Sequence, residues 1–305
     1  MIRLGLCCKF NTEPIAFRSA TALHLMKLTP SARAEKLAGI CRDNAAALRR
    51  AIEYCAANAI GDFRINSQIL PLKTHPAAGY GLEDLPGGPS IIKEFKGCGA
   101  LAKKLGMRLT FHPDQFVLLS SPSDKVTGSS MEELAYQAEV AGWTGADVIN
   151  IHGGGAYGDK DSALKRLAAV LKGLPAAVRS RLTLENDDRT YTPADLLPFC
   201  ADNKIPFVYD VHHHRCLPDG LSVEEVTSRA IKTWGGREPL FHLSSPKYGW
   251  KGDPLPHHDF IDMKDFPPCW KKLDITIEVE AKAKEDAIGR LAAGLKGVKL
   301  WKCRT

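Results

Sequence analysis

The sequence lacks several patterns that mark common classes of protein. No apolar stretch approaches the length needed to cross a bilayer, and no basic-then-apolar signal region opens the chain. We therefore expect a cytoplasmic protein without membrane contact. No GxGxxG follows the first apolar run, and no GxxxxGK occurs before Ser or Thr. The usual nucleotide-binding motifs are thus excluded, and we expect no nucleotide cofactor.

Cysteine is present without the spacing that disulfide frameworks or structural zinc sites use. The nine cysteines are odd in number and scattered, and no two form a CxxC pair. We expect reduced thiols in a reducing compartment. The net charge of +6 suits a nucleic-acid backbone as a partner but does not require one.

Eight short apolar runs, each ending in polar residues, recur along the chain: 2–8, 60–66, 108–114, 147–154, 181–187, 206–214, 239–245 and 274–282. Between them lie segments with helical periodicity: 31–58, 87–106, 129–146, 159–175, 192–203, 222–234 and 282–297. This alternation predicts a parallel sheet with helices outside, and eight units favour a closed (β/α)8 TIM barrel of the α/β class.

The same pattern extends over almost the whole sequence, so we expect one catalytic domain over residues 1–305. Two polar segments, at about 67–90 and 246–268, are expected to be loop insertions. Ser31 is the expected N-cap of the first long helix, and Ser129 with Glu132 has the spacing of a capping box.

Most of the metal-binding residue types lie where the predicted strands end. The ends of barrel strands meet at one mouth, so these side chains should converge: His112, His152, Glu185, Asp210, His213, His242 and Glu280. Such a mixed shell suits Zn²⁺ or Mn²⁺ and has too many nitrogens for a simple Mg²⁺ or Ca²⁺ site. Several close ions would favour phosphoryl chemistry, because they can clamp both oxygens of a displacement.

At these positions the sequence resembles the UV damage endonuclease family, barrel enzymes related to apurinic endonucleases and sugar isomerases. The resemblance covers nearly the whole chain and is strongest in seven motifs: FHPDQF (111–116), NIHGGG (150–155), LENDD (184–188), YDVHHH (209–214), HLSSPK (242–247), HHDFID (257–262) and VEAKAKE (279–285). It implies a DNA repair endonuclease that nicks duplex DNA immediately 5′ to UV photoproducts, by attack of a metal-bound hydroxide on the phosphodiester.

The resemblance also implies up to three ions, with Mn²⁺ expected and Zn²⁺ or Mg²⁺ as alternatives. His112, His152 and Glu185 would hold the first ion. Glu185 would bridge to a second, held also by Asp210, His242 and Glu280. His213 and His257 would hold the third, with His258 as the alternative to His257. Glu185, Glu280 and Asp210 are the residues expected to be catalytic.

For lesion binding, the resemblance implies that Gln115 and Phe116 probe the DNA. Phe116 departs from the family, in which tyrosine is usual, and an ordinary packed aromatic is the alternative interpretation. Asn11 is a candidate DNA contact or a plain turn residue. Leu240 stands where some members carry a lysine, which would alter the affinity for the third ion or the rate.

Other functions remain open on the same barrel. A sugar isomerase or epimerase would use similar ligands around one or two ions, and an apurinic-site endonuclease differs mainly in substrate. A non-catalytic binder of damaged DNA should have a broken ligand set, whereas Glu185 and Glu280 are both present. We expect a monomer whose partner is damaged double-stranded DNA, nucleoid-associated if the source is bacterial.

Overall fold

The computed structural model describes residues 1–303, and its core is a closed barrel of eight parallel strands in sequence order. The strands are β1 Ile2–Cys7, β2 Asp62–Ile65, β3 Arg108–Phe111, β4 Val148–His152, β5 Leu182–Glu185, β6 Phe207–Asp210, β7 Leu240–Leu243 and β8 Ile275–Val279. β8 pairs with β1, which closes the ring. Each strand falls inside one of the eight apolar runs, so the predicted TIM barrel is confirmed.

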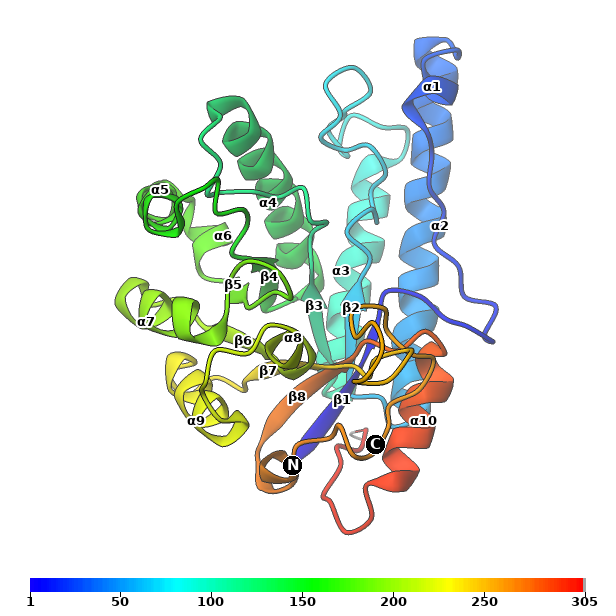
Figure 1. The fold of residues 1–305 in the computed structure, drawn as a ribbon. Helices are drawn as coiled ribbons and strands as arrows, with labels where there is room; N and C mark the ends of the chain where they lie inside the picture. Colours follow the sequence, from blue (N-terminus) through cyan, green and yellow to red (C-terminus); the bar gives the residue numbers. More distant parts are fainter. Residues whose placement is uncertain (304–305) are drawn as a thin grey trace.

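Helices lie around the outside of the strands (Figure 1). They are α1 Ala22–Leu25, α2 Pro30–Ala57, α3 Gly88–Leu105, α4 Asp124–Thr144, α5 Lys160–Gly173, α6 Ala176–Arg179, α7 Pro193–Asn203, α8 Val211–Cys216, α9 Val223–Thr233 and α10 Lys284–Gly294, with a 3₁₀ turn at Pro268–Lys272. No helix of the described residues is both long and apolar enough to span a membrane.

The two predicted helix starts are wrong. Thr29 caps α2 by accepting a hydrogen bond from the Ala32 amide, and Pro30 occupies the first turn, so Ser31 lies within the helix. α4 begins at Asp124, and Ser129 lies within it, not at its start. Intrinsic capping preference ranks serine highly, but the tertiary path of the incoming loop decides which residue leaves helical geometry first.

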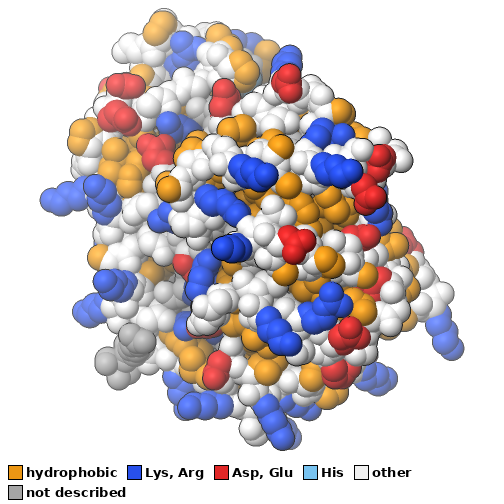
Figure 2. Space-filling view, turned by 90° about the vertical axis from the view of Figure 1, so that its left-hand side faces the viewer, with side chains coloured by type: hydrophobic (Ala, Val, Ile, Leu, Met, Phe, Trp, Pro, Cys, Tyr) orange, Lys and Arg blue, Asp and Glu red, His pale blue; other side chains and the backbone are white. Residues whose placement is uncertain are grey.

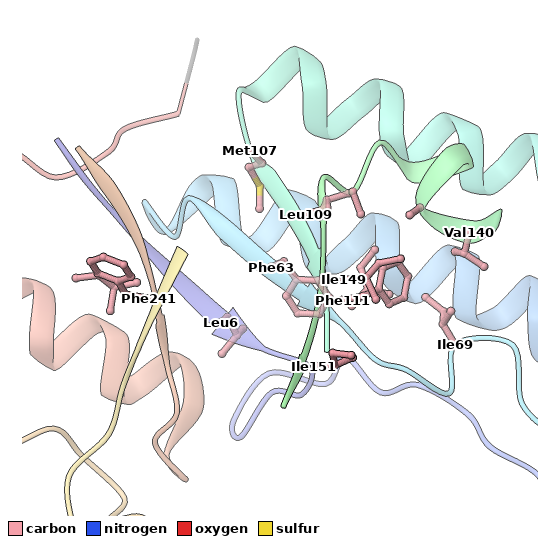
Figure 3. Packing of buried hydrophobic residues seen from close by; sticks show 14 of the residues in the cluster. Leu6, Phe63, Ile69, Met107, Leu109, Phe111, Val140, Ile149, Ile151 and Phe241 are labelled. Carbon is pink, nitrogen blue, oxygen red and sulfur yellow. The ribbon is translucent and has the colours of Figure 1, made fainter. Parts of the chain in front are cut away.

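The strands present two different surfaces, because successive side chains alternate in direction. The outward residues are apolar and pack against the helices, as Figure 3 shows for Phe63, Leu109 and Ile149. The inward residues are largely polar and meet across the barrel. For example, the Thr110 hydroxyl on β3 donates to Glu278 on β8 at 2.5 Å, although these strands are not neighbours.

The interior is apolar only toward the end of the barrel where the strands begin. Val148, Val208 and Leu240 form a small cluster there with Trp234. Leu240 therefore lies within an apolar layer, two residues before the inward-facing His242 on the same strand.

Both long polar segments follow strand ends and lie at the mouth side of the barrel. Residues 67–87 form no helix or strand, yet they are anchored to α4, because the Tyr136 hydroxyl accepts from the Leu70 amide and donates to the Ser67 carbonyl. The segment after β7 folds back on itself through an antiparallel bridge between Pro246 and His257. Residues 304 and 305, the end of the predicted domain, lie outside the described residues.

Candidate metal centre

Glu185, the last residue of β5, lies at the middle of the barrel mouth and is 1% exposed. Its Oε1 is 3.0 Å from His242 Nδ1, and its Oε2 is 3.0 Å from His112 Nε2. His213 Nδ1 approaches Oε1 at 3.4 Å. One carboxylate thus contacts imidazoles delivered by β3, β7 and the segment after β6, which is the position that a bridging ligand needs.

The remaining predicted ligands gather around Glu185. In each of three groups, the candidate ligand atoms lie within 4.8 Å of one another: His112 with His152 and Glu185, Glu185 with Asp210 and His213, and Asp210 with His242 and Glu280. The first group is the set expected for the first ion. The other two divide the remaining residues somewhat differently from the expectation, because Asp210 belongs to both.

The electrostatics of the centre depend on carboxylates and imidazoles facing each other out of water. Burial alone would raise the pKa of Glu185, but His242 and the other imidazoles outweigh burial and hold that pKa well below its usual range. Burial would likewise lower the pKa of His242, whereas Glu185 and Glu278 raise it well above its usual range. The carboxylate and the imidazole thus shift each other's pKa in opposite directions.

The donor atoms fit divalent cations. Asp210 Oδ2 and His152 Nδ1 are buried and have no hydrogen-bond partner among the described residues. Leaving such atoms unpaired is costly, and coordination of a cation would satisfy them. The described residues thus contain clusters that suit metal ions.

A short helix, α8, follows β6 directly and takes up the last residues of the apolar run 206–214, which was expected to be a strand. The Asp210 carboxylate caps this helix by accepting from the His213 amide at 2.8 Å. Asn186, completely buried, donates to the Asp210 carbonyl at 2.9 Å and accepts from its amide at 3.0 Å. Asp210 and His213 are therefore held in fixed positions, one helical turn apart, and both face Glu185.

The structure distinguishes the two loop histidines. His257 Nδ1 lies 3.7 Å from Glu280 Oε2, and its Nε2 lies 3.5 Å from the Ser244 hydroxyl. His258 is exposed, and its Nδ1 accepts from the Phe260 amide in its own loop. Only His257 therefore faces the centre.

Two residues that contact the predicted ligands were not predicted from the sequence. Glu278 is completely buried beneath the mouth, and Arg64 on β2 bridges it to Glu280, with Nη1 at 3.1 Å and 2.6 Å from the two carboxylates. Glu278 also lies 3.1 Å from His242 Nε2. The alternation of a strand would have indicated it, because Glu278 and Glu280 are two residues apart and share a face.

The predicted lesion-binding residues lie beside the centre. Gln115 borders two cavities of about 500 and 530 Å³, which reach His152 on one side and His112 on the other. Phe116 is 76% exposed, so it is not an ordinary packed aromatic. The side-chain amide of Asn11 donates to Asp286 at 3.1 Å, which ties it to the start of α10.

The model of the UV-endonuclease UvdE family matches residues 2–303. The chain belongs to the UvdE family. The UV DNA damage endonuclease of Bacillus velezensis (strain DSM 23117 / BGSC 10A6 / LMG 26770 / FZB42) is 35% identical over 303 residues, spanning 96% of this chain and 92% of that protein. The protein of the same name from Bacillus pumilus (strain SAFR-032) is also 35% identical, over 92% of this chain and 89% of its own. This UvdE protein is a DNA repair endonuclease, a hydrolase of phosphodiester bonds, and the predicted family is confirmed.

Solved structures agree with this assignment. The crystal structure of SacUVDE matches with a TM-score of 0.86 and 26% identity, over 97% of this chain and 98% of that one. Endonuclease IV from Thermus thermophilus shares the fold at 18% identity, with a TM-score of 0.58 over 81% of this UvdE chain and 93% of its own. The likeness to endonuclease IV concerns the fold alone.

Proposed function

We propose that this UvdE protein is a metal-dependent endonuclease that nicks duplex DNA immediately 5′ to UV photoproducts. The observation that carries the proposal is the position of Glu185 at the centre of a ring of imidazoles and carboxylates in a barrel of this family. The catalytic domain would comprise residues 1–305, with the two inserted segments forming the walls of the DNA groove.

In this proposal, His112, His152 and Glu185 hold the first ion, and Glu185 with Asp210, His242 and Glu280 holds the second. His213 and His257 hold the third, and Mn²⁺ is the proposed metal. When bound, closely spaced divalent ions activate water and stabilise charge on both sides of a phosphodiester. Glu185, Asp210 and Glu280 are the proposed catalytic carboxylates, because all three belong to the clustered groups.

Residues behind the ligands orient them. Asn150 donates to Glu185 Oε2 at 2.5 Å and accepts from Thr183 at 2.8 Å, so the bridging carboxylate has a fixed rotamer. Arg64 neutralises Glu280 and Glu278 from the β2 side. Hydrogen bonds that orient metal ligands usually affect metal affinity and activity nearly as much as the ligands themselves.

We propose that the protein recognises the damaged site by unstacking the damaged bases. Gln115 lies between two cavities at the edge of the mouth, and Phe116 borders one of them, so both would enter the base stack there. Extruding a poorly stacked lesion costs less than extruding intact bases, so unstacking itself selects damage. Asn11, in the loop after β1, is also proposed to contact the DNA.

The test uses end-labelled duplex DNA with one defined pyrimidine dimer, beside undamaged and abasic duplexes. With Mn²⁺, we expect a nick just 5′ to the dimer that leaves a 3′-hydroxyl and a 5′-phosphate. Glu185→Ala should lose at least about a thousandfold in rate, since it removes a shared ligand. The Lys232→Ala variant, on α9, should behave like the wild type.

Metal dependence is tested on the same substrate. Chelator should abolish nicking, and adding back Mn²⁺, Zn²⁺ or Mg²⁺ separately should rank the ions, while bound metal is measured by elemental analysis. Cleavage of the abasic duplex alone would instead make the protein an apurinic-site endonuclease. Full activity after complete metal removal would contradict the proposed centre.

A further inference from the structure

The exposed aromatic side chains of the described residues are all in loops that follow barrel strands. Phe116 follows β3, Tyr157 follows β4, and Tyr248 and Trp250 follow β7. Large aromatic surfaces are normally buried, and exposed ones near a nucleic-acid site serve as stacking platforms for bases. Phe116 is already placed in lesion binding, which leaves the loop after β7 unexplained.

The Tyr248 side chain is exposed and has few contacts of its own. It is 61% exposed, and its hydroxyl has no hydrogen-bond partner among residues 1–303. Its ring lies beside a neighbouring cation, with Lys247 Nζ 5.3 Å from the ring centroid. The tip of the loop, residues 247–253, is exposed throughout, whereas residues 241–246 beneath it are buried.

The tip is held rigidly. The Lys247 amide donates to the Pro256 carbonyl at 2.7 Å, and the His258 amide donates to the Ser245 carbonyl at 2.8 Å. Trp250 packs on His212, with ring centroids 5.2 Å apart. The ring centroids of His212 and His257 are 5.1 Å apart. The loop that presents Tyr248 is therefore braced against the candidate metal centre, so little ordering entropy would be lost on binding.

The loop that carries Tyr248 begins on the opposite side of the barrel from the loop that carries Phe116. β3 and β7 are four positions apart in a closed ring of eight strands, so their loops rise from opposite sides of the barrel. A duplex over the metal centre would lie between the two loops. One exposed aromatic would then reach it from each side.

We propose that Tyr248 is a second stacking residue, which packs on an unstacked base on the side of the lesion opposite to Phe116, with Lys247 against the adjacent phosphate. This inference rests on the proposed function. It assigns the loop after β7 to specificity for damaged DNA, because intact stacked bases offer no free face to the Tyr248 ring.

The experiment compares Tyr248→Ala, Tyr248→Leu and Tyr248→Phe on the single-dimer duplex with Mn²⁺. Loss of the ring should raise KM for the dimer duplex about tenfold, the size expected for one base–aromatic stack. Leucine keeps the apolar bulk without the ring, so it should behave like alanine, while phenylalanine should behave like the wild type. kcat should change little, because no metal ligand is altered. Lys247→Ala removes the proposed phosphate contact and should also raise KM. Its matched control is Lys232→Ala, which removes a surface cation on α9 at the opposite end of the barrel and should leave KM unchanged.

A second readout follows binding without cleavage. With 2-aminopurine beside the dimer, wild-type protein should raise the fluorescence as the base unstacks, and Tyr248→Ala should reduce that rise. Unchanged KM and fluorescence in the alanine and leucine variants would overturn the inference, as would equal losses for phenylalanine and alanine. If the wild type binds but never nicks, the proposed function fails and the fluorescence result still decides this inference. If the wild type does not bind the dimer duplex, both fail.

Discussion

Phe116 has the largest exposed fraction among the large hydrophobic side chains of the described residues, and it should contribute to activity without contributing to stability. Phe116→Ala should lower kcat/KM on the dimer duplex about tenfold, because one aromatic stack is lost. The free energy of unfolding should stay within about 0.5 kcal/mol of the wild type, as for other exposed positions. Nicking assays and urea denaturation measure the two effects separately.

Phe116→Tyr is the informative control, because it restores the residue that is usual in the family. We expect activity on the dimer duplex at least equal to the wild type. A strongly destabilised Phe116→Ala protein with normal nicking would instead show that the ring serves the fold.

At the scale of elements, an ion pair joins the N-terminal ends of three strands. Glu238, just before β7, accepts from Arg3 on β1 at 2.9 and 3.2 Å and from Thr276 on β8 at 2.5 Å. Burial raises the pKa of Glu238, but Arg3 and Thr276 outweigh it and leave that pKa below its usual range. The carboxylate form is therefore favoured by the fold.

Glu238→Gln should lower the free energy of unfolding by about 1 kcal/mol at pH 7, a modest value because the carboxylate is partly exposed. A depressed carboxyl pKa stabilises the fold above the unfolded value of about 4.3, and this contribution disappears as the pH falls through the folded value. The difference between wild type and variant should thus be constant above about pH 5 and should shrink at lower pH. Urea denaturation at several pH values checks this, and a difference independent of pH would contradict it.

At the scale of the whole molecule, the net charge is +6. Lys and Arg number 41 against 35 Asp and Glu, and on the face drawn in Figure 2 the basic side chains are spread widely, not gathered in one stripe. Such a distribution favours general attraction to DNA. In the proposed function, specific binding comes from the loops at the mouth.

The C-terminal segment packs against β1, one of the two strands that close the barrel. Trp301 is buried, its amide donates to the Ile2 carbonyl at 2.7 Å, and its ring lies 5.4 Å from the Arg3 guanidinium. Trp301→Ala should cost about 3–5 kcal/mol of unfolding free energy through the cavity it leaves. Thermal unfolding should report a lower Tm, with normal nicking per folded molecule, and Trp301→Phe should lose much less. A loss below about 1 kcal/mol would mean that the segment does not support β1.

The barrel and the composition of its mouth could be predicted from the sequence, because apolar runs of strand length alternate with helical periods and the strand ends carry His, Asp and Glu. These are local patterns. The sequence did not determine the first residue of α2 or α4, or that α8 follows β6, because those depend on how each loop meets the barrel.

Which polar residues contact one another depends on the tertiary structure. Glu278 and Arg64 lie 214 positions apart in the sequence and meet inside the barrel, and His257 rather than His258 faces Glu280 because of one bridge in its loop. Likewise, the loops that carry Tyr248 and Phe116 begin opposite each other because β3 and β7 stand on opposite sides of a closed ring. Contacts across the barrel interior depend on ring closure and register, which no local stretch of sequence encodes.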